Sequence, residues 1–236
     1  MGTIINALAV IIATFFGMVF KRGLSETLQK KIMFVLGLAL SALALGWFLS
    51  DFLVIDNDSI STRYDLLIII SLVLGSIIGT VIDIDGRLTR FANGVEKKYN
   101  LPPIAKGFVA GTLIFCVGVM AILGSIQDGL SGDITTLLVK SLLDFITAMM
   151  LASIFGIGVA FAAISILLYQ GSITILAMFL GAFLTTEMIM AVSMVGNILL
   201  IAMGMNFMEL KQIKVANMLP ALVIPLLYFF LLNIFF

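Results

Sequence analysis

Two acidic side chains lie inside long apolar stretches of this 236-residue sequence, and they are the residues best placed to carry chemistry. Glu187 is the one charged residue between positions 173 and 208, and Asp144 follows Lys140 by four positions. A charged group at membrane depth costs about 2.5–3.5 kcal/mol on insertion scales, so its presence calls for a partner or a function. A carboxylate in such a place can bind a cation or take up a proton.

Polar neighbours extend both positions into candidate sites. Glu187 closes the turn sequence 185–187, which lies either within the membrane at a broken helix pair or on the outer surface as an exposed turn. Lys140 and Asp144 share one helical face, so they predict either a polar pocket at the outer mouth or a helix-entry ion pair beside a solvated loop. The candidate transport-site residues are Glu187, Asp144, Lys140, Ser141, Gln127, Asp128, Thr186 and Asn197.

Residue types that support other chemistries are scarce. The sequence has no histidine and one cysteine, Cys116, which removes the commonest metal ligand and any thiolate cluster. Phosphate-loop, zinc-protease and nucleophile-elbow motifs are missing. The 13 basic residues balance 13 acidic ones, which disfavours nucleic acid as a partner. We therefore expect no enzyme activity, no cofactor and no bound metal.

The composition indicates an integral membrane protein. The chain is 62% hydrophobic and 11% charged, whereas a soluble domain is about half apolar and roughly a quarter charged. Too few charged residues are present to cover a surface that faces water. We expect residues 1–236 to form one transmembrane domain with the lipid bilayer as its surroundings.

Apolar runs long enough to cross a bilayer predict the fold class. A crossing helix needs about 20 apolar residues. Such runs cover 3–20, 31–50, 66–82, 104–126, 141–168 and 218–235, and the longer run 173–208 is interrupted by Glu187 alone. The prediction is an all-α, polytopic helical bundle with seven or eight membrane segments, one of them discontinuous or re-entrant.

The basic residues predict the orientation, because cytoplasmic loops are enriched in Lys and Arg. The loops 21–31, 83–106 and 209–217 hold 11 of the 13 basic residues, so we expect them in the cytoplasm with the N-terminus outside. A helix over 141–168 would then end in the cytoplasm near 169–172. The run 173–208 must consequently cross an even number of times, either as two short helices that turn at 185–187 or as a re-entrant hairpin.

A faint internal similarity suggests duplicated hairpins over 1–50 and 66–126, followed by a C-terminal bundle over 139–236. The segment 13–19 (ATFFGMV) is echoed by 75–81 (GSIIGTV), and 34–37 (FVLG) is echoed by 108–111 (FVAG). Repeats of this kind are typical of transporters. The competing explanation is the shared apolar composition of membrane helices.

Small residues recur at the spacing that brings helices together. They form the sets Gly75/Gly79, Gly107/Gly111 and Ala148/Ala152/Gly156/Ala160. These faces predict close packing within the bundle, or a homodimer that forms through them.

The middle of the chain carries a family resemblance. The stretch 115–130 (FCVGVMAILGSIQDGL) is followed by Gly132-Asp133, Lys140-Ser141 and Leu143-Asp144, and the opening 2–6 (GTIIN) also fits. Over essentially its whole length the chain resembles a bacterial integral-membrane family, domain of unknown function 554, the YqgA-like proteins. The resemblance implies a membrane or transport protein and supplies no catalytic residue. Phe145 stands where the family pattern has a glycine after the aspartate.

These observations together predict a secondary carrier or channel for a small solute or ion in the bacterial cytoplasmic membrane. Its site would lie near the broken 173–208 segment, with Glu187 as the ion or proton carrier and with Asp144 and Lys140 near the outer entrance. One alternative is a non-transport membrane scaffold or stress-response protein, in which both carboxylates tolerate neutral replacement. Another is an intramembrane enzyme with two converging carboxylates.

Overall fold

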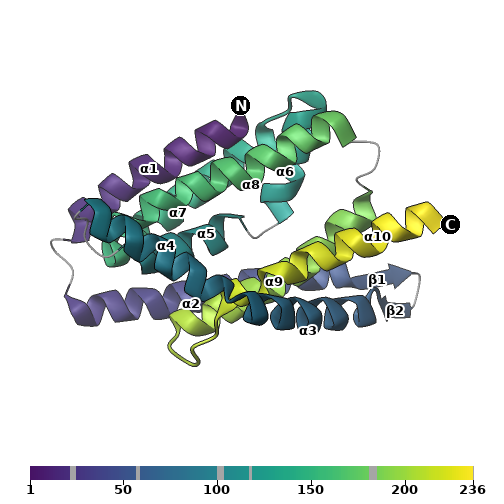
Figure 1. Ribbon diagram of the computed structural model, residues 1–236, viewed down its shortest axis with the longest axis horizontal. Coiled ribbons are helices and arrows are strands. Elements are labelled where there is room, and N and C mark those ends of the chain that lie inside the picture. Colours follow the sequence, from purple (N-terminus) through teal and green to yellow (C-terminus); the bar gives the residue numbers. More distant parts are fainter. Residues whose placement is uncertain (22–24, 57–58, 100–103, 117–118, 181–184, 236) are drawn as a thin grey trace. The chain divides into compact units, whose positions relative to one another are not determined.

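The computed structural model describes residues 1–21, 25–56, 59–99, 104–116, 119–180 and 185–235 (Figure 1). Apart from short connections, the described residues form helices and one antiparallel hairpin, in which Leu53 pairs with Thr62 and Asp56 with Ser59. The elements are α1 (Gly2–Lys21), α2 (Glu26–Phe52), β1 (Leu53–Asp56), β2 (Ser59–Thr62), α3 (Asp65–Ile82), α4 (Ile84–Tyr99), α5 (Ala105–Cys116), α6 (Val119–Ser131), α7 (Thr135–Phe155), α8 (Gly158–Leu180), α9 (Thr186–Phe207), the 3-10 helix η2 (Val215–Leu222) and α10 (Val223–Phe235).

Seven of these helical segments are long and apolar enough to cross a membrane, and the described part of the chain has an eighth if α5 and α6 form one bent span. Large apolar side chains point outward along them, for example Leu8 and Phe15 on α1 and Ile69 and Ile77 on α3. Such surfaces suit lipid, in which helices satisfy their own backbone hydrogen bonds. The predicted all-α, polytopic membrane fold is confirmed.

The chain divides into two compact units that each draw on distant parts of the sequence. Unit 1 comprises Met1–Met33 and Gly86–Gly181, and unit 2 comprises Phe34–Asp85 and Ala182–Phe236. The segment 139–236, predicted to form a C-terminal bundle, is therefore divided between the two units. Its parts of α7 and α8 belong to unit 1, and α9, η2 and α10 belong to unit 2. The single transmembrane domain stays a prediction.

The predicted helix over 141–168 is wrong in its boundaries. α7 ends at Phe155, Gly156 follows with a φ of 69°, and α8 begins at Gly158. Glycine adopts positive φ without the steric cost that a Cβ imposes, so it can end a helix inside an apolar run. The three long helices α7, α8 and α9 lie between residues 135 and 207, which matches the predicted number of crossings. The first turn, however, falls at 156–157, and residues 169–172 lie inside α8.

The discontinuous element also lies elsewhere than predicted. α8 and α9 are each long enough to cross a membrane, so the run 173–208 contains parts of two full helices, and 181–184 lie outside the described residues. The run 104–126 was expected to be one helix. It contains instead α5 and the start of α6, which are bent by 77° relative to each other. Hydropathy alone does not reveal this bend, because the sequence stays apolar through it.

The predicted basic loop 83–106 contains the polar helix α4. Asp83 ends α3 in the left-handed conformation, with a φ of 55°, and Asp85 stands in the first turn of α4. The amide of Asp85 donates to Oδ1 of Asn217 over 2.7 Å. The Asn217 side chain therefore satisfies a free amide at the start of α4, and the Asp85 carboxylate stands where the helix dipole favours an acidic group.

Small residues of the predicted repeats make close contacts inside each unit. A Cβ on Gly17 of α1 would collide with the carbonyl oxygen of Met149 in α7, and a Cβ on Gly79 of α3 would collide with that of Asn217. Gly17 and Gly79 hold equivalent places in the similar segments 13–19 and 75–81. The duplication stays a prediction, although the two glycines serve the same purpose in their own units.

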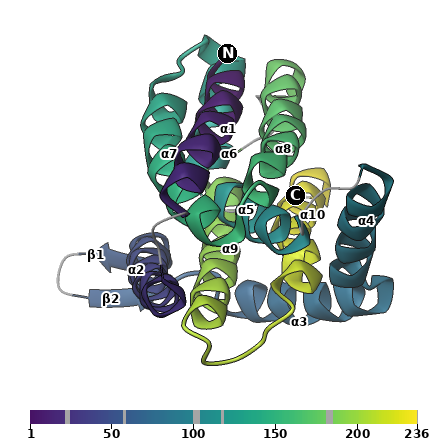
Figure 2. The same ribbon diagram turned by 90° about the vertical axis from the view of Figure 1, so that its left-hand side faces the viewer.

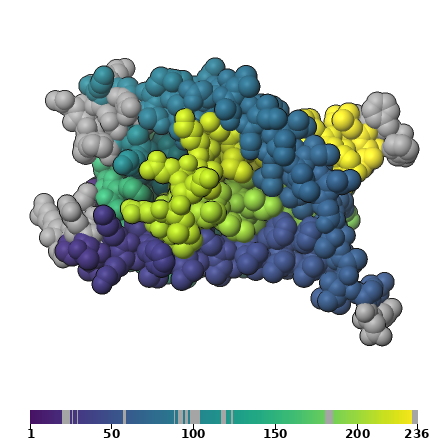
Figure 3. All heavy atoms as spheres, turned by 90° about the horizontal axis from the view of Figure 1, so that it is seen from below, coloured from purple at the N-terminus to yellow at the C-terminus, as the bar shows by residue number. Residues whose placement is uncertain are grey.

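Unit 2 is assembled around the same kind of contact. Gly37 of α2 meets the carbonyl oxygen of Gly204 in α9, where an added Cβ would lie 2.6 Å away, and Gly75 of α3 meets Ala221 of η2. Figure 3 shows the resulting face, on which residues 205–222 (yellow-green) lie between α2 (indigo) and α3 (blue). Gly75 and Gly79, which the sequence predicts to be packing positions, therefore contact a helix of the same unit.

Candidate functional site

Three helices of unit 1 bring polar side chains together in the interior of the unit. Nδ2 of Asn6 in α1 donates to Oδ2 of Asp144 in α7 over 2.9 Å, and it also lies 3.5 Å from Oε1 of Gln170 in α8. The Lys140 ammonium pairs with the same Oδ2 of Asp144. Asn6 and Gln170 are fully buried, and the Lys140 and Asp144 side chains are 7% and 10% exposed. With Thr3 and Thr174, which are also buried, these residues form what we name the polar cluster.

The periodicity of the helices explains this arrangement. On each helix, residues three or four apart share a face, and the buried faces here continue past the polar positions as Val10 on α1, Ala148 on α7 and Ile166 on α8. Polar residues therefore occupy positions on the mutual packing face that would otherwise be apolar. α1, α7 and α8 lie side by side in both views (Figures 1 and 2).

Close contacts show how these three helices align. Gly2 meets Leu137 and Gly17 meets Met149, so α1 and α7 run in the same direction. Gly129 of α6 meets the carbonyl oxygen of Thr174 in α8, next to Asp128, which binds the start of α1. α8 consequently returns toward the start of α1, and the polar cluster lies at that end of unit 1. The buried faces are mainly apolar toward the other end.

Four polar atoms of the cluster are buried without a hydrogen-bond partner among the described residues. They are Thr3 Oγ1, Asn6 Oδ1, Gln170 Nε2 and Thr174 Oγ1. An unmatched buried polar group costs about 1–3 kcal/mol, so native proteins leave few of them. Two further such atoms, Arg63 Nε and Asn197 Oδ1, belong to unit 2. Four of these six atoms thus belong to α1 and α8, the helices whose Asn6 and Gln170 extend the Lys140–Asp144 pair.

The chemistry of Asp144 sets the orientation of the Asn6 amide. A carboxylate accepts hydrogen bonds only, so the NH2 group of Asn6 must be the end that faces it. Oδ1 of Asn6 then points away from the carboxylate and remains available as an acceptor. Rotating the amide by half a turn would bring two acceptors together, which excludes the alternative assignment.

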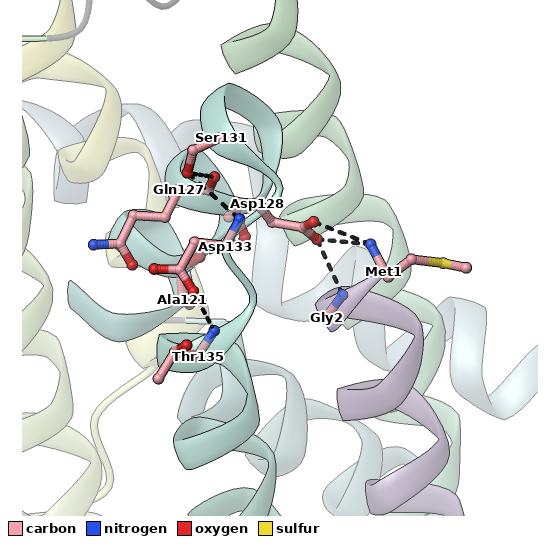
Figure 4. Close-up of polar contacts among 9 residues, drawn as sticks. Met1, Gly2, Ala121, Gln127, Asp128, Ser131, Asp133 and Thr135 are labelled. Carbon is pink, nitrogen blue, oxygen red and sulfur yellow. Dashed lines mark hydrogen bonds and ion pairs between the residues drawn. The ribbon is translucent and has the colours of Figure 1, made fainter.

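The residues of the 125–133 motif, by contrast, have structural partners (Figure 4). The Asp128 carboxylate accepts from the Gly2 amide over 3.0 Å and from the Met1 nitrogen over 2.8 and 3.1 Å, so it caps the start of α1. Oε1 of Gln127 accepts from the Thr136 hydroxyl over 2.6 Å. Gln127 therefore connects α6 to α7, and Asp128 connects α6 to α1.

Asp133 lies between α6 and α7 and is exposed. Its Oδ1 accepts from the Thr135 amide over 2.9 Å. Hydrogen bonds from the Thr135 side chain and, second, from that amide lower the pKa of Asp133. This aspartate stabilises the first turn of α7 without being part of the polar cluster.

The remaining predicted residues lie in separate places. Ser141 is buried on α7, but its hydroxyl donates to the carbonyl oxygen of Leu137 in its own helix. Glu187 and Thr186 are exposed in the first turn of α9, in unit 2. The Glu187 carboxylate is close enough to Tyr64 to contribute to the raised pKa of that phenol, although burial is the larger cause.

Asn197 belongs to a shorter polar chain inside unit 2. The Ser193 hydroxyl donates to Oδ2 of Asp51 over 2.6 Å, and Nδ2 of Asn197 lies 3.3 Å from the Ser193 hydroxyl. Asn197 is fully buried. This chain connects the end of α2 with the interior of α9 and contains one carboxylate without a basic partner among the described residues.

Sequence reasoning missed four members of the polar cluster: Thr3, Asn6, Gln170 and Thr174. The sequence predicts that Gln170 caps a helix or bonds between helices rather than touching a ligand, and it offers Asn6 only as part of the family pattern. A signal was present, because Thr3 and Asn6 are three apart and Gln170 and Thr174 four apart within apolar runs. Such spacing places polar groups on one helical face, but it does not say which helices meet.

Comparisons with known proteins agree with the fold. The chain is 33% identical to "Uncharacterized membrane protein YdfK" of Bacillus subtilis (strain 168) over 234 residues, which cover 99% of this chain and 97% of that protein. It is 28% identical to "Uncharacterized protein YqgA" of Escherichia coli (strain K12) over 235 residues, with 95% and 94% covered. No solved structure matches.

The family model that matches is described as "Protein of unknown function (DUF554)", and the match spans residues 1–230. The helices that suit a bilayer, together with the similarity to a relative named as a membrane protein, indicate a multi-pass membrane protein. The chain belongs to the DUF554 family.

Proposed function

We propose that the protein moves a small solute or ion across the bacterial cytoplasmic membrane, as a carrier or a channel, and that the polar cluster is its site. One observation carries the proposal: the two helices α1 and α8, whose Asn6 and Gln170 extend the buried Lys140–Asp144 ion pair, carry four unmatched buried polar atoms inside a membrane helix bundle. A scaffold gains nothing from such groups, and each is costly in an apolar interior.

The position of the bent helix pair supports the same site. α5 packs against α7 and ends at the buried Cys116, and α6 follows at an angle of 77°. Transporters place their binding sites beside broken helices, because the interrupted backbone frees polar groups there. The prediction of a site near a broken pair thus applies to α5 and α6 rather than to 173–208. Glu187 stays outside the proposed site.

The distribution of polar and apolar residues suggests how access is controlled. The cluster lies at the end of unit 1 where α1 begins, and with the N-terminus outside this end faces the exterior. Toward the cytoplasm, Val10, Ala148, Leu151 and Ile166 are fully buried and apolar. Transport through the cluster requires that these apolar contacts separate during part of the cycle, while the outer end closes.

Cysteine accessibility tests the proposal without knowledge of the solute. Thr174→Cys would be placed in a Cys116→Ala background and treated with a membrane-impermeant thiol reagent, on intact cells and on inside-out vesicles. The matched control is Thr14→Cys, because Thr14 is also a buried threonine but its hydroxyl donates to Val10 in the apolar half. Ser59→Cys, in the exposed hairpin, reports labelling from the outer face.

A transport site predicts that Thr174→Cys reacts from both faces, at least tenfold faster than Thr14→Cys, while Ser59→Cys reacts from outside only. Labelling of Thr174→Cys from neither face, with Ser59→Cys fully labelled, would contradict a solute path through the cluster and favour a scaffold.

A further inference from the structure

We propose that α4 lies along the cytoplasmic surface of the bilayer and binds the anionic headgroups of phospholipids through its basic residues. This binding surface is separate from the polar cluster. It depends on the proposed orientation, with the N-terminus outside, but not on whether the cluster conducts a solute.

α4 begins directly after a candidate membrane span. α3 is an apolar helix of 18 residues that ends at Ile82, and Asp83 then adopts the left-handed conformation with a φ of 55°. Asp83 alone separates the span from α4. Because a left-handed residue interrupts a right-handed helix, α4 is a separate helix that starts at the level where the span ends. With the N-terminus outside, this level is the cytoplasmic boundary of the bilayer.

The chain after α4 returns to the membrane within a few residues. α5 starts at Ala105, and a Cβ on Gly158 would lie 2.4 Å from the carbonyl oxygen of Ile104, at the end of unit 1 where α7 finishes. The 16 residues of α4 extend about 24 Å, whereas the five residues 100–104 reach about 20 Å when fully extended. An upright α4 would end beyond that reach, so the helix must incline toward the surface.

The sequence of α4 divides the helix into an apolar stripe and a basic flank. With about 100° between successive residues, four apolar positions fall within about 60° of one another. They are Ile84, Leu88, Phe91 and Val95. Four basic positions fall together about 220–320° from Ile84, and the two acidic positions, 85 and 96, lie at about 100–120° on the other side. The basic positions are Arg87, Arg90, Lys97 and Lys98. Helices that lie in the membrane interface have this pattern.

The described part of the basic flank faces open space. Arg87, Arg90 and Lys97 are exposed. Gly94 lies between Arg90 and Arg87 on the same flank, and an added Cβ there would meet nothing within 4 Å. Ile84, on the apolar stripe, is half-buried. A negatively charged ligand can therefore approach the basic flank.

Anionic phospholipid is the partner that fits both the position and the charge of α4. Anionic lipids in the cytoplasmic leaflet attract clusters of Lys and Arg near the surface. A bilayer also covers the apolar stripe, which a soluble anion would leave in water. The chain as a whole has 13 basic and 13 acidic residues, so the positive charge of this flank is a local feature.

Brominated lipids test this surface in the full-length protein. A fluorescent label would be attached to Val95→Cys, on the apolar stripe, or to Asn93→Cys, on the opposite side of α4, both in a Cys116→Ala background. Each protein would be reconstituted in phosphatidylcholine vesicles that contain the same small fraction of brominated phosphatidylglycerol or of brominated phosphatidylcholine. Bromine quenches a fluorophore that it contacts, so the ratio of the two quenching efficiencies reports which headgroup gathers at α4.

We expect brominated phosphatidylglycerol to quench the label at position 95 at least threefold more than brominated phosphatidylcholine does. Neither lipid should quench the label at position 93 strongly. High salt should bring the ratio toward one, because salt screens exposed charges.

Charge variants assign the lipid preference to the basic flank. Arg87→Gln/Lys97→Gln should abolish the preference for phosphatidylglycerol. Lys30→Gln/Lys31→Gln is the matched control, because it removes the same charge from exposed residues of α2, and it should retain the preference. A preference that survives in Arg87→Gln/Lys97→Gln would reject the basic flank as the binding surface.

Equal quenching by the two lipids at position 95 would overturn the inference, because α4 would then lie on the bilayer without selecting a headgroup. Quenching by neither lipid would also overturn it, since α4 would then be covered by protein or raised from the bilayer. The labelling of Thr174→Cys decides the transport proposal separately, so neither result changes that proposal.

Discussion

Asn6 in α1 and Asp144 in α7 are 138 positions apart in the sequence, and a hydrogen bond of 2.9 Å joins the Asn6 amide to the Asp144 carboxylate. The same carboxylate oxygen pairs with Lys140. One acidic group therefore connects two helices and balances the only buried ammonium among the described residues of unit 1. Its environment explains how a charge is accommodated within this bundle.

Replacing Asp144 with Ala should strongly destabilise the protein. The Lys140 ammonium would remain buried without a counter-ion, and removing one partner of a buried pair typically costs about 3–5 kcal/mol. The free energy of unfolding in detergent or bicelles would measure the effect. The double variant Lys140→Met/Asp144→Leu should recover most of the loss, because it removes both charges. Equal losses in the single and double variants would show that the pair is not the cause.

Gly79→Ala should destabilise unit 2, whereas Gly46→Ala should not. A Cβ at Gly79 would collide with the Asn217 carbonyl, and one at Gly46 of α2 would meet nothing within 4 Å. Overpacking costs about 1–3 kcal/mol, while an unhindered Gly→Ala change in a helix gains about 0.5–1 kcal/mol. Thermal unfolding of both variants checks this contrast. A Gly79→Ala protein as stable as wild type would disprove the close contact between α3 and η2.

Asp128→Ala should loosen the start of α1. The Asp128 carboxylate binds the Gly2 amide, and a hydrogen bond to a charged group is worth about 1.5–3 kcal/mol. Hydrogen exchange measured peptide by peptide should become faster over residues 2–8 and stay unchanged in α9. Asp133→Ala is the control, because its carboxylate binds Thr135 of α7 instead. Faster hydrogen exchange over residues 2–8 in Asp133→Ala would contradict the assignment of Asp128 to the start of α1 and of Asp133 to α7.

The first turn of α7 should weaken in acid through Asp133. Hydrogen bonds from the Thr135 side chain and amide lower the pKa of Asp133 below its ordinary value of 3.8. Its contribution is therefore complete above about pH 4 and is lost as the pH falls through the lowered pKa. Hydrogen exchange at Thr135 should show this acid step in wild type but not in Asp133→Asn. A step of the same size in both proteins would assign it to another group.

The sequence was sufficient for the class of fold and for the number of membrane segments, because apolar runs of the required length report burial in lipid directly. It was not sufficient for the break at Gly156 or for the bend between α5 and α6. Both occur inside continuous apolar sequence, where hydropathy does not change, and the end of α7 is decided by the positive φ of Gly156 alone.

The candidate site was predicted in part. Lys140 and Asp144 could be paired from their spacing, since neighbours four apart meet on a helix. Asn6 and Gln170 could not be joined to them, because contacts between α1, α7 and α8 depend on tertiary packing rather than on local sequence. The role of Glu187 as a carrier stays a prediction, and the structure describes this residue as exposed in the first turn of α9.

The most direct test of a polar path through unit 1 uses the native Cys116, the one cysteine of the chain. Its rate of reaction with a small, membrane-impermeant methanethiosulfonate would be measured in wild type, in Glu187→Gln and in Lys140→Met/Asp144→Leu. We expect equal rates in wild type and Glu187→Gln, and a rate at least tenfold lower in the double variant, whose cluster admits less water. Equal rates in all three proteins, or slowing in Glu187→Gln alone, would contradict a polar path through unit 1.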